Sequence, residues 1–230
     1  MRSRRSVSSR QIQTATPPFQ FVIRARYNPE QLTVLNIVPG LTCIVLLMST
    51  LLITSLSITR ERERGTMENL MAMPVKPIEI MLAKIVPYVV IGYVQVILIL
   101  VVSSVVFHLP IRGSIPLLLL ALGLFIASNL ALGLAFSTIA TSQMQAQQLA
   151  QFTLLPSVML SGFMFPFAGM PVWAQWIGEI FPTTRAIRIV RGVLLKSNGA
   201  AAIAPELWPT ALFTLVVIAV AVWSYRETLD

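Results

Sequence analysis

Long apolar stretches separated by short polar ones fill the chain from about residue 36 onward. A helix that crosses a bilayer needs about 20 consecutive, mainly apolar residues, because hydrocarbon offers its backbone no water to bond. Four stretches meet this requirement, and a fifth meets it with interruptions by Pro and Gly. Polar residues between them, such as 141–148 and 197–206, are predicted to be connections. We therefore predict an all-α, polytopic membrane protein with about five transmembrane helices, at residues 38–59, 85–107, 115–140, 149–167 and 207–225.

The first 35 residues differ in character from the rest of the chain. Residues 1–18 are rich in Ser, Arg and Thr and poor in large apolar side chains, so we expect them to be disordered. Residues 19–26 alternate loosely, as in a short strand, and one strand cannot stand alone. We divide the chain into a tail, 1–35, and a transmembrane domain, 36–230.

The segment RERERGTMENL, residues 60–70, follows the first predicted span directly and carries six charged side chains in its first nine positions. Nothing else in this apolar chain is so dense in charge. On a helix, Arg60 would pair with Glu63, and Glu61 with Arg64, at a spacing of three residues. Such pairs predict a stiff charged turn that a soluble partner can grip.

A short helix is predicted after the charged turn. Gly65 interrupts the run of charge, and residues 66–73 place methionines and Leu70 on one side until Pro74 stops the helix. Pro77 suits the first position of a helix, so a new helix is predicted to run from there into the second span.

The predicted fourth span is broken by Pro and Gly and leads into an aromatic segment, which favours a re-entrant hairpin that leaves near the surface it entered. A basic helix is predicted to follow at 183–197. Its arginines lie opposite Ile187, Val190 and Leu194, which is typical of a helix lying along the membrane interface. The residues assigned to the hairpin and the interfacial helix are Pro166, Pro171, Trp173, Pro182, Arg188 and Arg191.

Composition and charge agree with a bilayer as the solvent. Hydrophobic residues make up 56% of the 230 residues and the mean hydropathy is +0.78, which is more than a globular domain needs to fill its core. The net charge of +8 raises the question of nucleic-acid binding. However, the basic residues lie at the ends of apolar spans, and no soluble domain is left to carry a groove-reading element. We therefore expect the lipid bilayer, and no nucleic acid, as a partner.

Candidate catalytic and metal-binding groups are scarce. One cysteine, Cys43, and one histidine, His108, cannot build a metal site of ordinary ligand count, so no metal is expected. A nucleophilic serine would need a base such as His or Lys within hydrogen-bond reach, and no Lys lies inside a predicted span. We interpret the serines of the spans as small residues that let helices approach closely, and we expect no enzymatic activity.

The polar side chains at membrane depth are amides and hydroxyls rather than ionisable groups. Ion channels and proton-coupled carriers place ionisable groups at that depth, so energy for uphill transport would have to come from elsewhere. Each of these residues is a candidate for lining the path of an amphiphilic substrate, with hydrogen bonding between helices as the alternative. They are Gln95, Asn129, Gln151 and Thr153.

Three segments carry a resemblance to a known family. RERERGTMENLMAMPVKPIEIMLAKIVPY resembles the cytoplasmic coupling segment of ABC exporter permeases of the type 2 class, particularly the bacterial multidrug-type group. LSGFMFPFAGMPVWAQWIGEIFPTTRAIRIVRGVLLKSNG is similar to the bent fifth helix, re-entrant external hairpin and basic interfacial helix of that family. RYNPEQ with IVPG, residues 26–31 and 37–40, resembles the approach to the family's second span. The likeness covers roughly residues 19–230.

The resemblance implies a permease subunit that exports amphiphilic, drug-like compounds across the plasma membrane, the bacterial inner membrane. ATP and Mg²⁺ would be bound by a separate ATP-binding subunit rather than by this chain, which has no Gly-rich phosphate-binding loop. A second permease subunit would complete a homo- or heterodimer. A polysaccharide or lipid exporter of the same class, and a non-transporting membrane partner, are the alternatives. The positions that match the family's coupling segment are Arg60, Glu61, Gly65, Thr66, Glu68 and Leu70.

The chain departs from the family at its start. Family members begin with one more transmembrane helix and a large external domain before the segment equivalent to Phe19, so residues 19–26 are expected to be a remnant of an external segment. Charge bias also opposes the resemblance, because a cytoplasmic charged turn leaves more Lys and Arg outside than inside. We keep the turn in the cytoplasm because the later basic cluster can snorkel from an interfacial helix.

Overall fold

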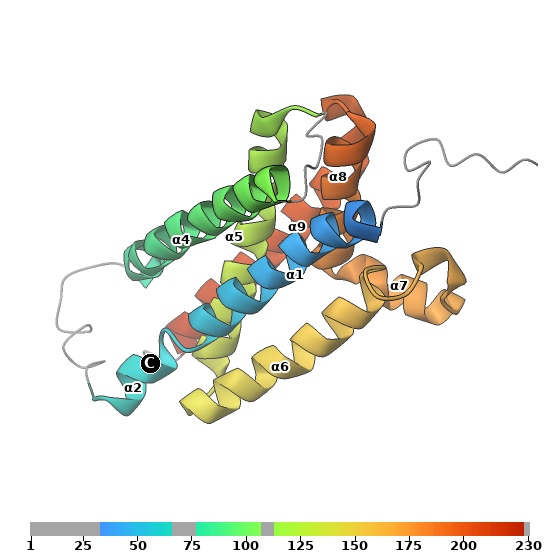
Figure 1. The fold of residues 1–230 in the computed structure, drawn as a ribbon. Coiled ribbons are helices and arrows are strands. Elements are labelled where there is room, and N and C mark those ends of the chain that lie inside the picture. The colour runs from blue at the N-terminus through green and yellow to red at the C-terminus, as the bar shows by residue number, and fades with distance from the viewer. Residues whose placement is uncertain (1–32, 66–76, 107–112, 228–230) are drawn as a thin grey trace, which may run out of the picture.

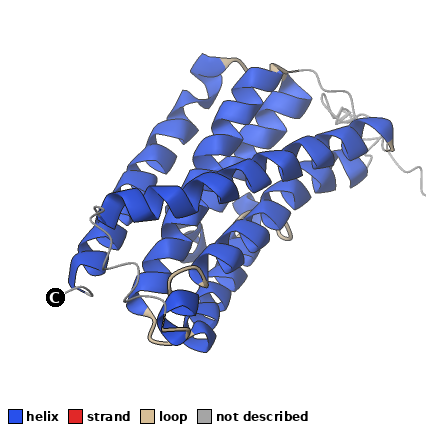
Figure 2. Ribbon diagram, turned by 90° about the vertical axis from the view of Figure 1, so that its left-hand side faces the viewer, coloured by secondary structure: helices blue, strands red, loops and turns tan. Residues whose placement is uncertain are grey.

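A computed structural model describes residues 33–65, 77–106 and 113–227. Residues 1–32 of the predicted tail and the predicted short helix at 66–73 lie outside these residues, whereas residues 33–35 of the tail belong to the first helix. Every described element is helical, which confirms the all-α prediction for this part of the chain (Figures 1 and 2). The elements are α1 (Thr33–Ser55), α2 (Thr59–Glu63), α4 (Pro77–Val105), α5 (Ile115–Ile139), α6 (Gln143–Leu160), η1 (Phe167–Gly169), α7 (Val172–Ile180), α8 (Pro182–Lys196) and α9 (Ala200–Glu227).

Four of the described helices are long and apolar enough to cross a membrane, and they correspond to four of the five predicted spans. The candidate spans are Ile37–Glu63, Ile85–Val105, Ile115–Ile139 and Ala200–Val222. The fifth predicted span, 149–167, corresponds in part to α6, which is not among them. Its first turns carry several glutamines, and these make it too polar to qualify by composition.

Two predicted connections are wrong, because both contain helix. Residues 141–148 were expected to be a connection, but α6 begins at Gln143, where the Ser142 hydroxyl accepts a hydrogen bond from the Gln145 backbone at 3.2 Å. That bond is an N-terminal cap, and glutamine is a good helix former. Residues 197–206 were also expected to be a loop, but α9 begins at Ala200.

The remaining helix bounds confirm some predictions and correct others. α4 begins at Pro77, as predicted. α1 starts at Thr33 rather than near Pro39, which lies inside the helix. α6 ends at Leu160, before Gly162 takes a positive φ of 77°, so the helix stops short of the predicted end at residue 167.

α1 and α5 form the interior of the bundle, and α4 and α9 lie at its periphery. Of the 18 most apolar consecutive residues of the span that contains α1, 61% are buried, and the same holds for α5. The corresponding share is 17% for α4 and for α9. α5 packs against α1, α4, α8 and α9, and Figure 1 shows it passing through the middle of the helices. α4 leaves Val90, Val94 and Ile97 exposed, which suits a helix that faces lipid.

Small and hydroxyl-bearing residues bring the inner helices together. Ser128 of α5 and Thr214 of α9 share a hydrogen bond of 2.6 Å, and both are buried. Gly133 of α5 lies against α1 so closely that an added Cβ would be 2.8 Å from the Cβ of Thr54 and 3.0 Å from the Leu51 carbonyl oxygen. The interpretation of polar and small residues as sites of close helix approach is therefore confirmed at these positions.

Gly133→Ala should destabilise the bundle, because the new methyl group meets backbone and a short β-branched side chain that cannot move aside. We expect a loss of about 1–3 kcal/mol, the usual cost of overpacking, seen as a lower thermal midpoint of the purified protein in detergent. Gly169→Ala is the matched control, since an added Cβ there meets nothing within 4 Å. Equal midpoints for the two variants would contradict the close packing of α1 on α5.

Candidate functional site

The junction between α1 and α2 is held by one hydroxyl of α5. α1 ends at Ser55, and α2 begins after a turn at residues 56–58. The backbone N–H groups of Ile58 and Thr59 both donate to Ser137 Oγ, at 2.8 and 3.1 Å. Ser137 is only 1% exposed, so its hydroxyl satisfies two donors that a buried chain would otherwise leave unpaired.

α2 is also bonded to the connection between α5 and α6. Arg62 Nη1 donates to the carbonyl oxygen of Ala140, where α5 ends, at 3.2 Å. Glu63 accepts hydrogen bonds from the backbone N–H of Gln143, at 2.7 Å, and from the side-chain amide of the same residue. The predicted pairing of Glu63 with Arg60 is therefore wrong, because Glu63 binds the start of α6 instead.

Three of the six predicted coupling residues lie in the described part of the chain, and three lie outside it. Arg60 and Glu61 line a polar hollow of about 370 Å³ between α2 and α4, together with Arg64 and Tyr88. Gly65 has a positive φ of 68°, a conformation that most residues other than glycine avoid. The three residues outside the described ranges are Thr66, Glu68 and Leu70.

The predicted path residues do not gather into one site. Gln95 of α4 accepts a hydrogen bond from Ser49 of α1 at 2.7 Å, so it links two helices. Thr153 donates to the Leu149 carbonyl oxygen within α6, at 3.1 Å. Asn129 is completely buried in α5, and neither its amide nitrogen nor its oxygen has a partner among the described residues. Hydrogen bonding between helices therefore accounts for Gln95.

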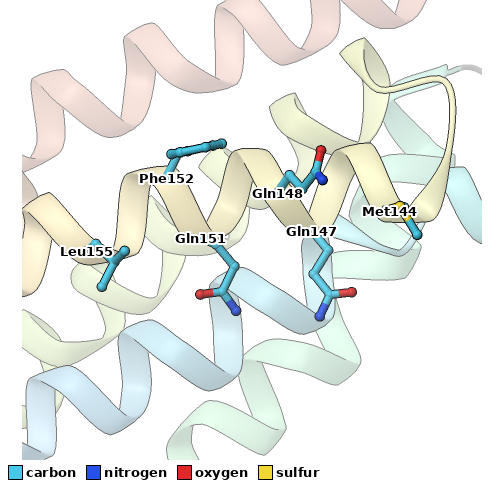
Figure 3. A pocket seen from close by; sticks show the side chains of 6 residues that line it. All are labelled: Met144, Gln147, Gln148, Gln151, Phe152 and Leu155. Carbon is cyan, nitrogen blue, oxygen red and sulfur yellow. The ribbon is translucent and has the colours of Figure 1, made fainter.

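Gln151 instead belongs to an open face of α6. Figure 3 shows Gln147 and Gln151 projecting from one side of this helix and Phe152 from another, and these side chains line an open hollow. The hollow measures about 310 Å³, and Phe152 is 75% exposed. Gln147 was missed by the sequence analysis, although its spacing of four residues from Gln151 places both on one side of a helix. The lining residues are Met144, Gln147, Gln148, Gln151, Phe152 and Leu155.

A network of ion pairs joins α7, α8 and α9 at the other end of the bundle. Arg185 lies 3.1 Å from a Glu179 carboxylate oxygen and 3.2 Å from one of Glu206. Arg188 pairs with the same two carboxylates and lies 4.5 Å above the Phe167 ring. Burial alone would lower the pKa of Arg188, but hydrogen bonds and attraction from Glu179 and then Glu206 raise it overall.

The predicted hairpin residues mark the starts of helices in this region. Pro166 and Pro171 immediately precede η1 and α7, and Pro182 is the first residue of α8. Trp173 is 66% exposed, and Arg191 donates to the Gly162 carbonyl oxygen at 3.3 Å.

α8 is a helix, as predicted, and its apolar side is buried. Ile187, Val190 and Leu194 are all at most 5% exposed, and the helix packs against α1, α5 and α9. The re-entrant path and the position of α8 along the membrane surface stay predictions.

A comparison of the sequence with known families decides the class of protein. Residues 2–223 match the family described as ABC-2 family transporter protein. The chain belongs to this family. It is a multi-pass membrane permease and not an enzyme.

Curated relatives of the permease cover most of its length. It is 34% identical over 187 residues to the probable multidrug ABC transporter permease YbhS of Escherichia coli (strain K12), which is 81% of this chain and 50% of the relative. It is 33% identical over 214 residues to the inner membrane transport permease YhhJ of the same strain, 90% of this chain and 55% of the relative. ABC transporter G family member 20 of Dictyostelium discoideum is 27% identical over 172 residues, 75% of this chain and 24% of the relative. The permease thus spans about half the length of the bacterial relatives it matches.

Glu206→Gln should weaken the attachment of α8 to α9, since it removes the negative charge that both arginines share. The side chains are partly exposed, so we expect a loss of only about 1 kcal/mol in the free energy of unfolding. Added salt should shrink the difference between variant and native protein, because it screens partly exposed pairs. A thermal midpoint that is unchanged at low salt would show that the network contributes nothing to stability.

Proposed function

We propose that this permease is the membrane-spanning subunit of an ATP-driven exporter that moves amphiphilic small molecules out across the plasma membrane. ATP and Mg²⁺ would bind to a separate ATP-binding subunit that docks at the α2 end of the bundle. No cofactor would be held by this chain. Drug-like compounds are the substrate class, as the names of the multidrug relatives suggest for those proteins.

The open face of α6 is the observation that carries this proposal. It sets three glutamine amides among a methionine, a phenylalanine and a leucine, so it offers hydrogen bonds and apolar contact in one hollow (Figure 3). An amphiphile presents the same two kinds of surface. The described lining holds no ionisable side chain, which fits energy supplied by a separate subunit better than proton coupling at this hollow.

The same face supports the proposal of a second permease subunit. Glutamine amides turned toward hydrocarbon would lose their hydrogen bonds to water, at about 1–3 kcal/mol for each unpaired group. Gln147, Gln148 and Gln151 are all exposed in the single chain. A dimer that faces two α6 helices across a path would place these amides against substrate, water and each other instead of lipid.

The α2 end supports the docking of an ATP-binding subunit. Arg60 and Arg64 are exposed there and line a polar hollow, and α2 is bonded to both α5 and α6. Through these bonds, a displacement of α2 would also displace α5 and α6.

Copurification followed by ATP turnover tests the proposal. The tagged permease should bring down an ATP-binding subunit, and amphiphilic drugs should stimulate ATP turnover of the complex in proteoliposomes. Gln147→Leu with Gln151→Leu should lower that stimulation about tenfold, since each lost polar contact to a substrate costs roughly 1 kcal/mol or more. Met144→Leu, a change of similar volume in the same hollow, is the matched control and should keep it.

Three results would count against this account. Stimulation by polysaccharide precursors or lipids instead of drugs would favour another exporter of the class. A chain that copurifies with no ATP-binding subunit would favour a non-transporting membrane partner. Full stimulation in the double glutamine variant would remove the α6 face from the substrate path.

A further inference from the structure

The side chain of Glu63 caps the first turn of a helix to which it does not belong. Its carboxylate accepts the backbone N–H of Gln143 at 2.7 Å and the side-chain amide of the same residue. Gln143 is the first residue of α6, so its N–H has no acceptor within that helix. The negative charge also lies at the positive end of the helix dipole. Residues 80 positions apart in the chain are joined here by two bonds.

The turn that Glu63 binds is itself closed by local hydrogen bonds. The Gln145 backbone N–H donates to Ser142 Oγ at 3.2 Å, and Gln145 Oε1 accepts from both the backbone and the hydroxyl of Thr141, each at 2.8 Å. These three bonds tie residues 141–145 together. A displacement applied at Gln143 moves the start of α6 as one unit instead of fraying it.

α2 has the arrangement of a short lever. Its beginning is fixed to α5, because Ser137 Oγ accepts the N–H groups of Ile58 and Thr59. Its end carries Glu63, one α2 length away, which is about 7.5 Å for five residues. A rotation about Ser137 moves Glu63 more than any other residue of α2. Figure 1 shows α2 and the start of α6 side by side at this end of the bundle.

α6 leads from this contact to the hollow of the candidate path. Its buried side, at Ala146, Ala150 and Leu154, faces the bundle, and α6 packs along α1. Its open side carries Gln147 and Gln151 within the first nine residues of the helix. Gln147, Gln148 and Gln151, which we call the glutamine face, therefore lie within about two helical turns of Gln143. A movement of Gln143 would shift them as part of the same helix.

We propose that Glu63 is a positioning residue that couples α2 to α6, so that movement of the charged turn changes the place of the glutamine face. This proposal rests on the proposed function, which supplies the ATP-binding subunit that would move α2 and the amphiphilic substrate that α6 would bind. The joint between α2 and α6 is a property of this chain alone and can be measured without a partner.

Spin labels test the joint. Labels at Arg64→Cys and Met144→Cys, both exposed positions, report the distance between the end of α2 and the start of α6. Cys43 is fully buried and does not compete for label. With Glu63 present, the distance distribution should be narrow. Glu63→Ala should broaden it about twofold or more, because the bond that Arg62 then still makes near this end reaches the end of α5 and not α6.

Ser142→Ala is the matched control, because it removes a cap bond of α6 but leaves Glu63 bound to Gln143. If Glu63 only caps α6, the two variants should behave alike. If Glu63 joins the two helices, only Glu63→Ala should broaden the distribution. A size-exclusion profile like that of the native protein would show that each variant is folded.

A functional arm uses the complex with its ATP-binding subunit in proteoliposomes. Glu63→Ala should keep subunit copurification and basal ATP turnover, and should lose drug-stimulated turnover about fivefold or more, the lower range for coupling between linked sites. Ser142→Ala should keep the stimulation. Narrow label distances in Glu63→Ala, or equal loss in both variants, would overturn the proposal. Failure of the native chain to bind any ATP-binding subunit would reject the proposed function, and the label distances would still decide the joint.

Discussion

The α2 end of the permease depends on the need to satisfy backbone donors where a long apolar helix stops. α1 ends at Ser55, and the amides that follow at Ile58 and Thr59 are buried against α5. Ser137 supplies one hydroxyl for both, and this places α2 against the connection between α5 and α6. The bonds of Arg62 and Glu63 to that connection follow from this placement. A charged turn that composition alone would treat as a loop becomes a fixed part of the bundle.

The two ends of the bundle handle charge in different ways. At the far end, Arg185 and Arg188 are partly buried and neutralised by Glu179 and Glu206, which fastens α7, α8 and α9 to each other. At the α2 end, Arg60 and Arg64 stay exposed beside a polar hollow. The far end therefore uses its charges for internal cohesion, whereas Arg60 and Arg64 at the α2 end remain on the surface.

The sequence predicted the apolar helices well, because hydropathy responds to the same constraint that builds them. It failed at α6, since five glutamines resemble a connection in hydropathy although they form helix readily. The cap formed by Ser142 and Gln145 was a readable signal for that helix start. The contact between Glu63 and Gln143 was not readable, because local spacing favoured Arg60 as the partner and only the tertiary fold brings α6 close. Asn129 is fully buried and its side-chain atoms have no partner among the described residues, so its predicted role in a substrate path stays a prediction.

Accessibility of the α2 end to thiol reagents is the most direct test of the central claim, that α2 is a cytoplasmic handle. A membrane-impermeant maleimide should leave Arg64→Cys unlabelled in intact cells and label it in inverted membrane vesicles. The native chain should stay unlabelled in both, because its only cysteine, Cys43, is buried. Labelling of Arg64→Cys from outside intact cells would contradict the account, since no ATP-binding subunit could then reach α2.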